Sequence, residues 1–251
     1  MRAIDLNADL GETVEGMPTA DDEAMFAVIS SASVACGGHA GDAGSMRDAI
    51  ARAGRFGVAV GAHPSYPDRA GFGRLRIAVE PADLAESLAV QLEALVGAGG
   101  DLRYVKPHGA LYHAVTTDPA EAGVVVRVVA DLSARLGRPV PILGSGGAIA
   151  RAAAGAGVPF VREAFLDRGY RPDGSLVARG APGALLTDPV AVAERAVRVV
   201  LEGVVDTIDG TEVDVDAESL CLHGDSPESV AMARTVRAAL DVHRIAVRPP
   251  W

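Results

Sequence analysis

The feature that most constrains the fold is an alternation that runs along the whole chain. Short apolar segments typical of buried strands are followed by segments with helical periodicity. Strands that alternate with helices pair in parallel through right-handed crossovers. The strand-like segments are Ala3–Leu10, Ser33–Gly37, Gly57–Ala62, Leu102–Val105, Val140–Leu143, Val158–Val161 and Ser219–Leu222. The expected helices are Asp21–Ala32, Gly44–Phe56, Pro81–Val96, Pro119–Leu136, Ala148–Ala154, Val190–Leu201 and Pro227–Leu240.

Two architectures fit this alternation, a closed barrel and an open doubly wound sheet. No Gly-x-Gly-x-x-Gly turn follows the first strand, which disfavours a dinucleotide fold. Polar residues follow every strand instead of gathering at one switch point, and a barrel site collects groups from many strand ends. We therefore predict an α/β fold, a seven-stranded, TIM-like (β/α) barrel. The chain shows no linker or internal repeat, so residues 1–251 are expected to form a single domain.

Composition excludes several classes of protein. A formal net charge of −10 argues against a nucleic-acid partner. The N-terminus meets an acid at Asp5, unlike a signal peptide, and no apolar run is long enough to span a membrane. Cys36 and Cys221 lie apart in apolar segments, as reduced core thiols do. These features predict a cytoplasmic protein without membrane contact, and leave a homo-oligomer open.

Histidines and carboxylates recur at the predicted strand ends. Four of the six histidines lie there, and on one rim of a barrel they would face one cavity. Histidines opposite carboxylates indicate general acid–base catalysis or one divalent metal. With no His-Glu-x-x-His motif, a metal would need ligands from separate strands, and Asp9, His39 and His63 are the expected set. The residues at these ends are His39, His63, His108, His223, Asp5, Asp9, Glu12, Asp42, Glu163, Asp167 and Asp225.

Lys106 and Asn7 stand out because each is the only residue of its type. The chain otherwise uses arginine, yet it places its one lysine at a strand end beside His108. A compact ammonium is not interchangeable with a guanidinium, so Lys106 is a candidate for the reaction. The alternative is that Lys106 only pairs with a buried carboxylate.

Two further segments are candidates for anion binding. The Gly144–Gly147 turn precedes a helix and could cradle an anion with its backbone amides, although the chain has no P-loop. The excursion from Gly169 to Leu186 contains a Pro172-Asp173-Gly174 turn and is expected to form a hairpin. It is either a lid or partner-docking surface, or a solvated cover of the barrel mouth.

Six motifs follow one another across almost the whole chain: Asp5–Glu12, Ala35–Asp42, Gly61–Asp68, Val105–Tyr112, Glu163–Arg168 and His223–Asp225. Together and in this order they resemble the LamB/YcsF family. His113 stands where that family usually has Asn, Ser33 where it tends to have Asn, and Gly38 where it has Phe. Gly38 and His113 are expected to reshape the pocket wall.

The resemblance implies a (β/α) barrel of the glycoside hydrolase/deacetylase type. It also implies the activity of the A-subunit of an ATP-dependent 5-oxoprolinase, which opens 5-oxo-L-proline to L-glutamate. ATP would be the co-substrate, a divalent metal is possible, and two further subunits would be partners. Ring opening needs an activated water, a proton for the nitrogen and stabilisation of the carbonyl oxygen.

Roles for the motif residues follow from these needs. Asp9 or Asp42, with His39 or His63, would activate water, and Lys106 and His108 would hold the oxyanion or the substrate carboxylate. Two alternatives remain: a metal-dependent deacetylase or amidase that needs no ATP, and a non-catalytic subunit that binds the small molecule. The residues expected to bind substrate are Asn7, Glu12, Glu163, Arg168, His223 and Asp225.

Overall fold

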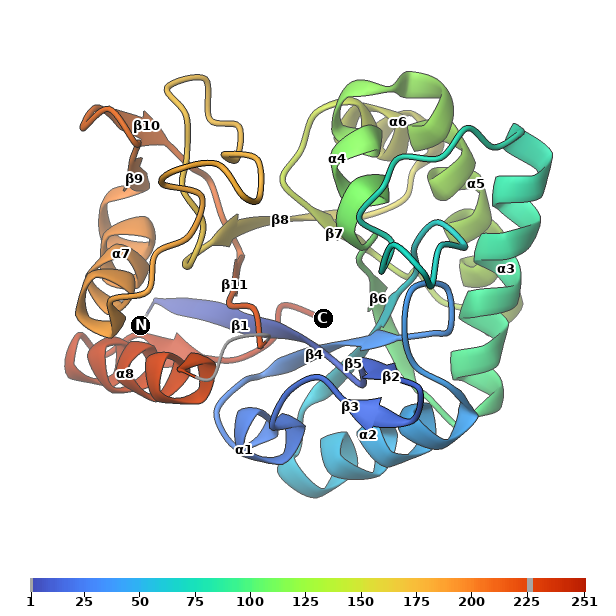
Figure 1. Cartoon of the computed structure of the whole chain (residues 1–251), viewed down its shortest axis with the longest axis horizontal. Coiled ribbons are helices and arrows are strands. Elements are labelled where there is room, and N and C mark those ends of the chain that lie inside the picture. Colours follow the sequence, from blue (N-terminus) through green and yellow to red (C-terminus); the bar gives the residue numbers. More distant parts are fainter. Residues whose placement is uncertain (1, 225–227) are drawn as a thin grey trace.

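The computed structural model describes residues 2–224 and 228–251, and it confirms the seven-stranded barrel. The strands pair in parallel in the order β11-β8-β7-β6-β5-β4-β1, and the pairing of β1 with β11 closes the ring (Figure 1). Polar groups from several strand ends are thereby brought to one mouth of the barrel. The barrel strands are β1 (Ala3–Leu10), β4 (Ser31–Ala35), β5 (Ala59–His63), β6 (Leu102–Val105), β7 (Ile142–Gly144), β8 (Phe160–Phe165) and β11 (Ser219–Cys221).

Helices surround the barrel, as Figure 1 shows. Their starts and stops follow local chemistry: Asp118 and Asp188 accept backbone N–H bonds at N-termini, and prolines occupy the first turn. Gly57 and Gly203 end helices in the left-handed conformation that glycine adopts freely. The helices are α1 (Asp22–Phe26), α2 (Ala43–Phe56), α3 (Pro81–Gly97), α4 (Gly109–Thr117), α5 (Pro119–Leu136), α6 (Ala148–Ala156), α7 (Pro189–Glu202) and α8 (Ser229–Val242).

Strand β1 has the predicted bounds, and every residue from Ile4 to Leu10 is buried. Asp5, Asn7 and Asp9 bond partners on other barrel strands, which places them on the inner face. Successive side chains of a strand alternate, so Leu6 lies on the outer face beneath the helices. The polar stripe of β1 therefore runs up the inside of the barrel towards its mouth.

The first predicted helix is wrong beyond Phe26. The sequence pattern predicts a helix over Asp21–Ala32, but α1 ends at Phe26 and β4 already begins at Ser31. The hydroxyls of Ser30 and Ser31 donate to the buried Asp5 carboxylate at 2.6 and 2.7 Å, which draws this segment into the barrel wall. Buried polar groups need such partners, and the apolar periodicity carries no sign of them.

Other elements depart from the prediction. The helix α4 is not predicted because Pro107 and Gly109 beside His108 indicate a loop, whereas burial of Leu111 and Val115 stabilises a helix. The excursion forms a turn with an antiparallel bridge between Tyr170 and Leu176, not a regular hairpin. The predicted start of the last helix lies partly outside the described residues. The remaining strands are β2 (Thr13–Val14), β3 (Met17–Pro18), β9 (Val204–Asp206), β10 (Glu212–Asp214) and β12 (Ala246–Val247).

The end of the barrel opposite the mouth is closed by aromatic packing. Tyr104 on β6 is fully buried, and its ring stacks on Trp251 with centroids 4.2 Å apart. Leu143 and Val161 pack in the same cluster, and the C-terminus lies within the ring of strands in Figure 1.

In the part of the chain that the structure describes, no helix combines the length and the apolar character needed to cross a bilayer.

Candidate active site

The mouth of the barrel contains a cavity of about 410 Å³. It receives groups from the ends of β1, β5, β6, β8 and β11 and from the loops that follow them. The structure therefore brings most of the predicted site residues to one place. The lining residues relevant here are Asp9, Glu12, His63, Arg74, Lys106, His108, Tyr112, His113, Phe165, Arg168, Leu176, Arg179 and His223.

Lys106 is the central cation of the site and is only 1% exposed. Its Nζ lies 3.1 Å from a carboxylate oxygen of Asp9 and 3.1 Å from one of Glu163. It also donates to Asn7 Oδ1 at 3.0 Å and to the sulfur of Cys221 at 3.1 Å. Burial by itself lowers the pKa of Lys106, but Asp9 and the other anions outweigh it and hold the pKa well above its usual value. Lys106 is therefore a fixed positive charge.

The same charges act on Asp9. Burial tends to raise the pKa of Asp9, but His63 and Lys106 bring it well below its usual value. One oxygen of Asp9 faces Lys106, and the other lies 3.3 Å from His63 Nε2. Asp9 is thus an ionised carboxylate in contact with both Lys106 and His63.

Three histidines form a compact cluster beside Asp9. The rings of His39 and His108 are stacked, with centroids 3.6 Å apart, and His63 meets His108 edge-on. His39 Nε2 lies 3.2 Å from Glu12 Oε1. Burial, together with the neighbouring histidines, lowers the pKa of His39 and of His108 well below the usual value. Both rings are therefore neutral near pH 7.

Backbone bonds determine where the protons of two of these rings lie. His63 Nδ1 is 2.8 Å from the carbonyl of Lys106, and His108 Nε2 is 3.0 Å from the carbonyl of Phe72. A carbonyl only accepts, so both nitrogens carry their hydrogens. When both rings are neutral, His63 Nε2 and His108 Nδ1 present lone pairs to each other at 2.9 Å. That arrangement fits a shared proton or a cation between them.

A divalent cation fits the cluster chemically. One ligand atom from each of Glu12, His39, His63 and His108 lies within 4.8 Å of the others. Backbone carbonyls orient His63 and His108 in the way that outer-shell groups orient metal-binding imidazoles. The set predicted from sequence is Asp9, His39 and His63. Asp9 groups instead with Cys221 and His223, although one of its oxygens reaches His63.

Glu163 and Asn7 lie directly beneath Lys106. Glu163 Oε2 faces the ammonium and accepts from Asn7 Nδ2 at 3.3 Å. Within the described residues, Glu163 Oε1 is buried without a hydrogen-bond partner. Both residues are expected from sequence to bind substrate, and the structure places them around the lysine that faces the cavity.

Arg168 and His223 lie on the side of the cavity next to the excursion. Arg168 is buried and donates to the carbonyls of Val177 and Ala184, so it holds the excursion over the mouth. His223 Nδ1 lies 2.9 Å from Asp167. Burial tends to raise the pKa of Asp167, but His223 outweighs this effect, so the pKa lies below its usual value. Both residues line the cavity, as expected.

Asp42 is not brought to the cavity. It is exposed and is the N-cap of α2, where Oδ1 accepts from Gly44 N at 2.7 Å and from Ser45 N at 2.9 Å. The N–H groups of Ser45 and Gly44 stabilise the ionised carboxylate and so lower the pKa of Asp42. An Asp between a strand and a helix serves as a cap as readily as a catalyst. Asp225 lies outside the described residues.

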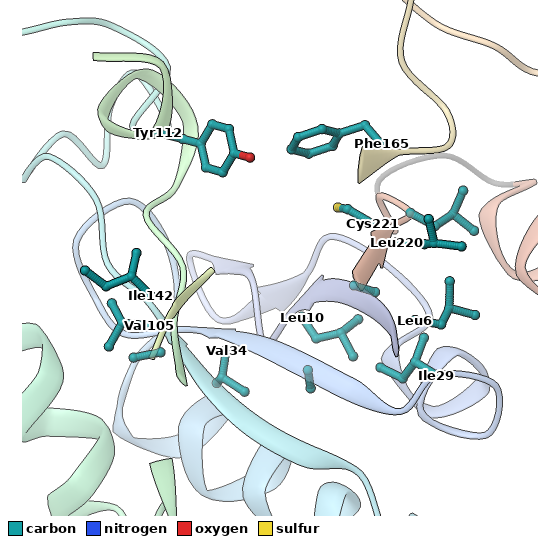
Figure 2. Packing of buried hydrophobic residues seen from close by; sticks show 14 of the residues in the cluster. Leu6, Leu10, Ile29, Val34, Val105, Tyr112, Ile142, Phe165, Leu220 and Cys221 are labelled. Atoms are coloured by element: carbon teal, nitrogen blue, oxygen red, sulfur yellow. The ribbon is translucent and has the colours of Figure 1, made fainter. Parts of the chain in front are cut away.

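Sequence reasoning assigned no role to two aromatic residues of the site. Tyr112 and Phe165 face each other at the mouth, with centroids 5.5 Å apart in an edge-to-face arrangement (Figure 2). Tyr112 belongs to the motif that contains Lys106. It lies four residues after His108, and residues four apart share one face of a helix, so this spacing could have indicated that Tyr112 faces the site. Cys221 lies below the pair in Figure 2, close enough to accept from Lys106.

Gly38 does not line the cavity, contrary to expectation. A Cβ at this position would lie 2.3 Å from Gln91 Oε1 and 2.5 Å from Ser65 Oγ. Gln91 is buried and bonds both the N–H and the carbonyl of Ser65. The side chain of Gln91 therefore fills the space beside Gly38. His113, in contrast, does line the cavity.

The chain is similar to known proteins over nearly its whole length. The sequence model of the LamB/YcsF family matches residues 4–250. The chain is 47% identical over 249 residues to the 5-oxoprolinase A-subunit of Corynebacterium jeikeium, covering 98% of this chain and 95% of that protein.

Solved structures give the same result for the fold. The structure of "Lactam Utilization Protein" from Thermus thermophilus superposes with a TM-score of 0.90 at 39% identity, covering 98% of this chain and 99% of that one. A peptidoglycan N-acetylglucosamine deacetylase domain from Eubacterium rectale shares the fold at a TM-score of 0.52 and 12% identity, over 100% and 89% of the two chains. The family model spans nearly the whole chain, so the chain belongs to the LamB/YcsF family.

Proposed function

We propose that this chain is the A-subunit of an ATP-dependent 5-oxoprolinase, a hydrolase that opens the cyclic amide of 5-oxo-L-proline to L-glutamate. The observation that carries the proposal is the near full-length relationship to proteins named as the A-subunit of 5-oxoprolinase. A cavity of about 410 Å³ suits a small ligand. We assign to the side chains that line this cavity the activation of water, the protonation of the leaving nitrogen and the stabilisation of the carbonyl oxygen, which opening a lactam requires.

Water activation is assigned to Asp9 and His63. Asp9 is an ionised carboxylate, and His63 Nε2 lies 3.3 Å from its Oδ2, so in the absence of a bound cation either group can accept the proton of the attacking water. Attack of the activated water on the lactam carbonyl forms the new C–O bond and an oxyanion. Breakage of the C–N bond then needs a proton on nitrogen, and the group that accepted the water proton can return it.

Charge stabilisation is assigned to Lys106. Its ammonium is fixed by three acceptor oxygens and faces the cavity, so it is already oriented when negative charge develops on the carbonyl oxygen. His108 supplies the neighbouring wall. The substrate carboxylate is assigned to the arginine side of the cavity, which Arg74, Arg168 and Arg179 line.

A divalent cation would be held by Glu12, His39, His63 and His108. When bound, it would polarise the carbonyl and lower the pKa of a water molecule. The facing lone pairs of His63 and His108 are the observation that favours it. We propose that the metal content of the purified chain is close to one ion per molecule.

ATP hydrolysis is assigned to the assembled complex, with this chain in the cytoplasm beside two further subunits. The chain has no P-loop, so we expect no ATP-coupled ring opening by the chain alone. The Gly144–Gly147 turn at the start of α6 remains the place in this chain where phosphate oxygens could meet backbone amides.

The decisive experiment measures glutamate release from 5-oxoproline and ATP, by the chain alone and with both partner subunits. We expect glutamate and ADP in equal amounts only from the complete mixture. Equal amounts from the chain alone would contradict the assignment to a complex of several subunits, and no glutamate from the complete mixture would contradict the substrate assignment.

A second function, a metal-dependent amidase that needs no ATP, is favoured by the Glu12–His39–His63–His108 cluster. It predicts hydrolysis of a simple amide by the chain alone and full inhibition by a chelator. Activity that requires ATP and both partner subunits, whether or not metal is present, would exclude this alternative.

A further inference from the structure

The inside of the barrel contains a buried polar chain that leads away from the cavity. It runs from Lys106 through Asn7 and Ser219 to Asp5, all of them at most 1% exposed. Asp5 and Ser219 are not among the cavity-lining residues, so ligands do not reach them there. The strand register places Asp5, Ser219 and Glu163 side by side on β1, β11 and β8.

The hydroxyl of Ser219 has one hydrogen, and it donates this hydrogen to Asp5 in a hydrogen bond. Ser219 Oγ donates to Asp5 Oδ2 at 2.5 Å, because an ionised carboxylate can only accept. Towards Asn7 the same oxygen is therefore an acceptor. The group of Asn7 that faces it at 2.8 Å must be the NH₂ of the amide. Glu163 Oε2, also an acceptor, lies 3.3 Å from the same NH₂.

The orientation of the amide determines what Lys106 meets. With the NH₂ directed at Ser219 and Glu163, Asn7 Oδ1 points at the ammonium and accepts at 3.0 Å. If the amide were reversed, its NH₂ would face the ammonium, and Glu163 would lose the donor that it has in Asn7. The remaining partners of Lys106 are Asp9, Glu163 and Cys221.

We infer that Asp5 and Ser219 are positioning residues: through the proton of Ser219 they hold the Asn7 amide in the one orientation that gives Lys106 its neutral acceptor. This inference deepens the proposed function and rests on it for its kinetic consequence only. The geometry itself concerns the free protein. Ser31, which donates to the other oxygen of Asp5 at 2.7 Å, does not bond Asn7 and takes no part in the positioning.

The composition offers two clean probes. Asn7 is the only asparagine and Lys106 the only lysine of the chain. Protein labelled with ¹⁵N-asparagine and ¹³C-lysine therefore gives one side-chain amide pair and one Lys Cε signal by NMR. Two variants are compared. Ser219→Ala interrupts the series of hydrogen bonds from Asp5 to Lys106, and Ser31→Ala removes an equivalent bond to Asp5. Both serines are fully buried.

We expect Ser219→Ala to shift the Asn7 amide pair and the Lys106 Cε signal, while Ser31→Ala leaves both in place. In the complete mixture, Ser219→Ala should lower kcat by about 10- to 100-fold, because a small misplacement of a group that acts on the substrate can cost about 100-fold in rate. Ser31→Ala should stay within about twofold, and Ser219→Thr, which keeps the hydroxyl, should restore both signals and kcat.

Unchanged Asn7 and Lys106 signals in folded Ser219→Ala would overturn the inference, as would equal shifts in Ser31→Ala. The NMR comparison needs no substrate, so it remains decisive if the unmodified chain and its partners release no glutamate. That second outcome would instead refute the proposed function. A fall in kcat for Ser219→Ala without a change of the Lys106 signal would also overturn the inference.

Discussion

The two ends of the barrel differ in chemistry although the same strands build them. At the mouth, Lys106 follows directly after β6 and carries a buried charge surrounded by Asp9, Glu163 and Asn7. Two residues earlier, Tyr104 of β6 stacks on Trp251, which closes the opposite end of the barrel together with Leu143 and Val161. One end of the barrel gathers buried polar groups and the other is packed with aromatic and aliphatic side chains, the usual division in a (β/α) barrel.

The difference shows where the fold accepts unfavourable burial. Charged and polar groups at the mouth tolerate burial only because each has partners, and an uncompensated charge there would be strongly destabilising. At the closed end most of the buried area is aromatic and aliphatic, and burial of such area is favourable by itself, while the Tyr104 hydroxyl is paired with Ser33 Oγ at 2.9 Å. Substitutions at the mouth should therefore affect activity first, and substitutions at the closed end should affect stability alone.

The largest effect is expected at Lys106. Lys106→Arg should remove most activity of the complete mixture, by about 10²–10³-fold, because a planar guanidinium cannot replace the point charge among its three acceptor oxygens. The measurement is the rate of glutamate release, with circular dichroism to verify the fold.

A matched control lies three residues before Lys106, on β6. Arg103 is partly exposed and pairs with Asp101 at 3.4 Å, away from the cavity. Arg103→Lys should leave the rate within about twofold, since surface ion pairs contribute little. Near-normal turnover by Lys106→Arg would show that Lys106 is a structural charge only.

Asp5 should give the next largest effect, on the pH dependence of stability. Burial, partly offset by the serine hydroxyls, raises the pKa of Asp5 from 3.8 to about 6. The folded state therefore binds the proton more tightly than the unfolded state. The stability that this proton contributes is present below about pH 4 and is lost as the pH rises through about 6.

The Asp5→Asn variant isolates this contribution, because Asn cannot titrate. Relative to the unmodified chain, its free energy of unfolding should improve by up to about 3 kcal/mol between pH 4 and pH 7. Urea unfolding at a series of pH values measures the difference. A difference that does not change with pH would contradict the raised pKa.

Trp251 tests the closed end. Trp251→Ala removes the ring that stacks on Tyr104 and should lower the free energy of unfolding by about 2 kcal/mol, since Trp251 is only partly buried. Activity per folded molecule should not change. Because Trp251 is the only tryptophan, unfolding is followed by circular dichroism. Val242→Ala, at a 77% exposed position, is the control. A large loss of kcat in Trp251→Ala would mean that the two ends are coupled.

The smallest effect is expected at Asp42. Asp42→Ala removes the cap of α2 and should lower stability by about 1 kcal/mol, while glutamate release stays normal. Asp42→Asn, which keeps a capping oxygen, should recover most of that stability. Loss of activity without loss of stability in Asp42→Ala would show that Asp42 takes part in the reaction.

Much of this organisation can be predicted from the sequence. Alternating apolar and helical segments determine a parallel (β/α) arrangement, because only that order of elements buries all the apolar faces. The rarity of lysine and asparagine singled out Lys106 and Asn7, and the structure joins them by a hydrogen bond of 3.0 Å. The position of a polar residue at a strand end predicted the location of His63, His108 and His223.

Other features depend on contacts between residues far apart in the chain, and the tertiary structure alone decided them. Ser31 pairs with Asn7 and Ala59 in the barrel and bonds Asp5, and burial of the apolar face of α4 stabilises that helix. Asp42 and Asp9 both follow or end a strand-like segment, yet one caps a helix and the other meets Lys106. Local sequence determines which elements form. The pairing of side chains across the barrel depends on register and closure, which no local pattern contains.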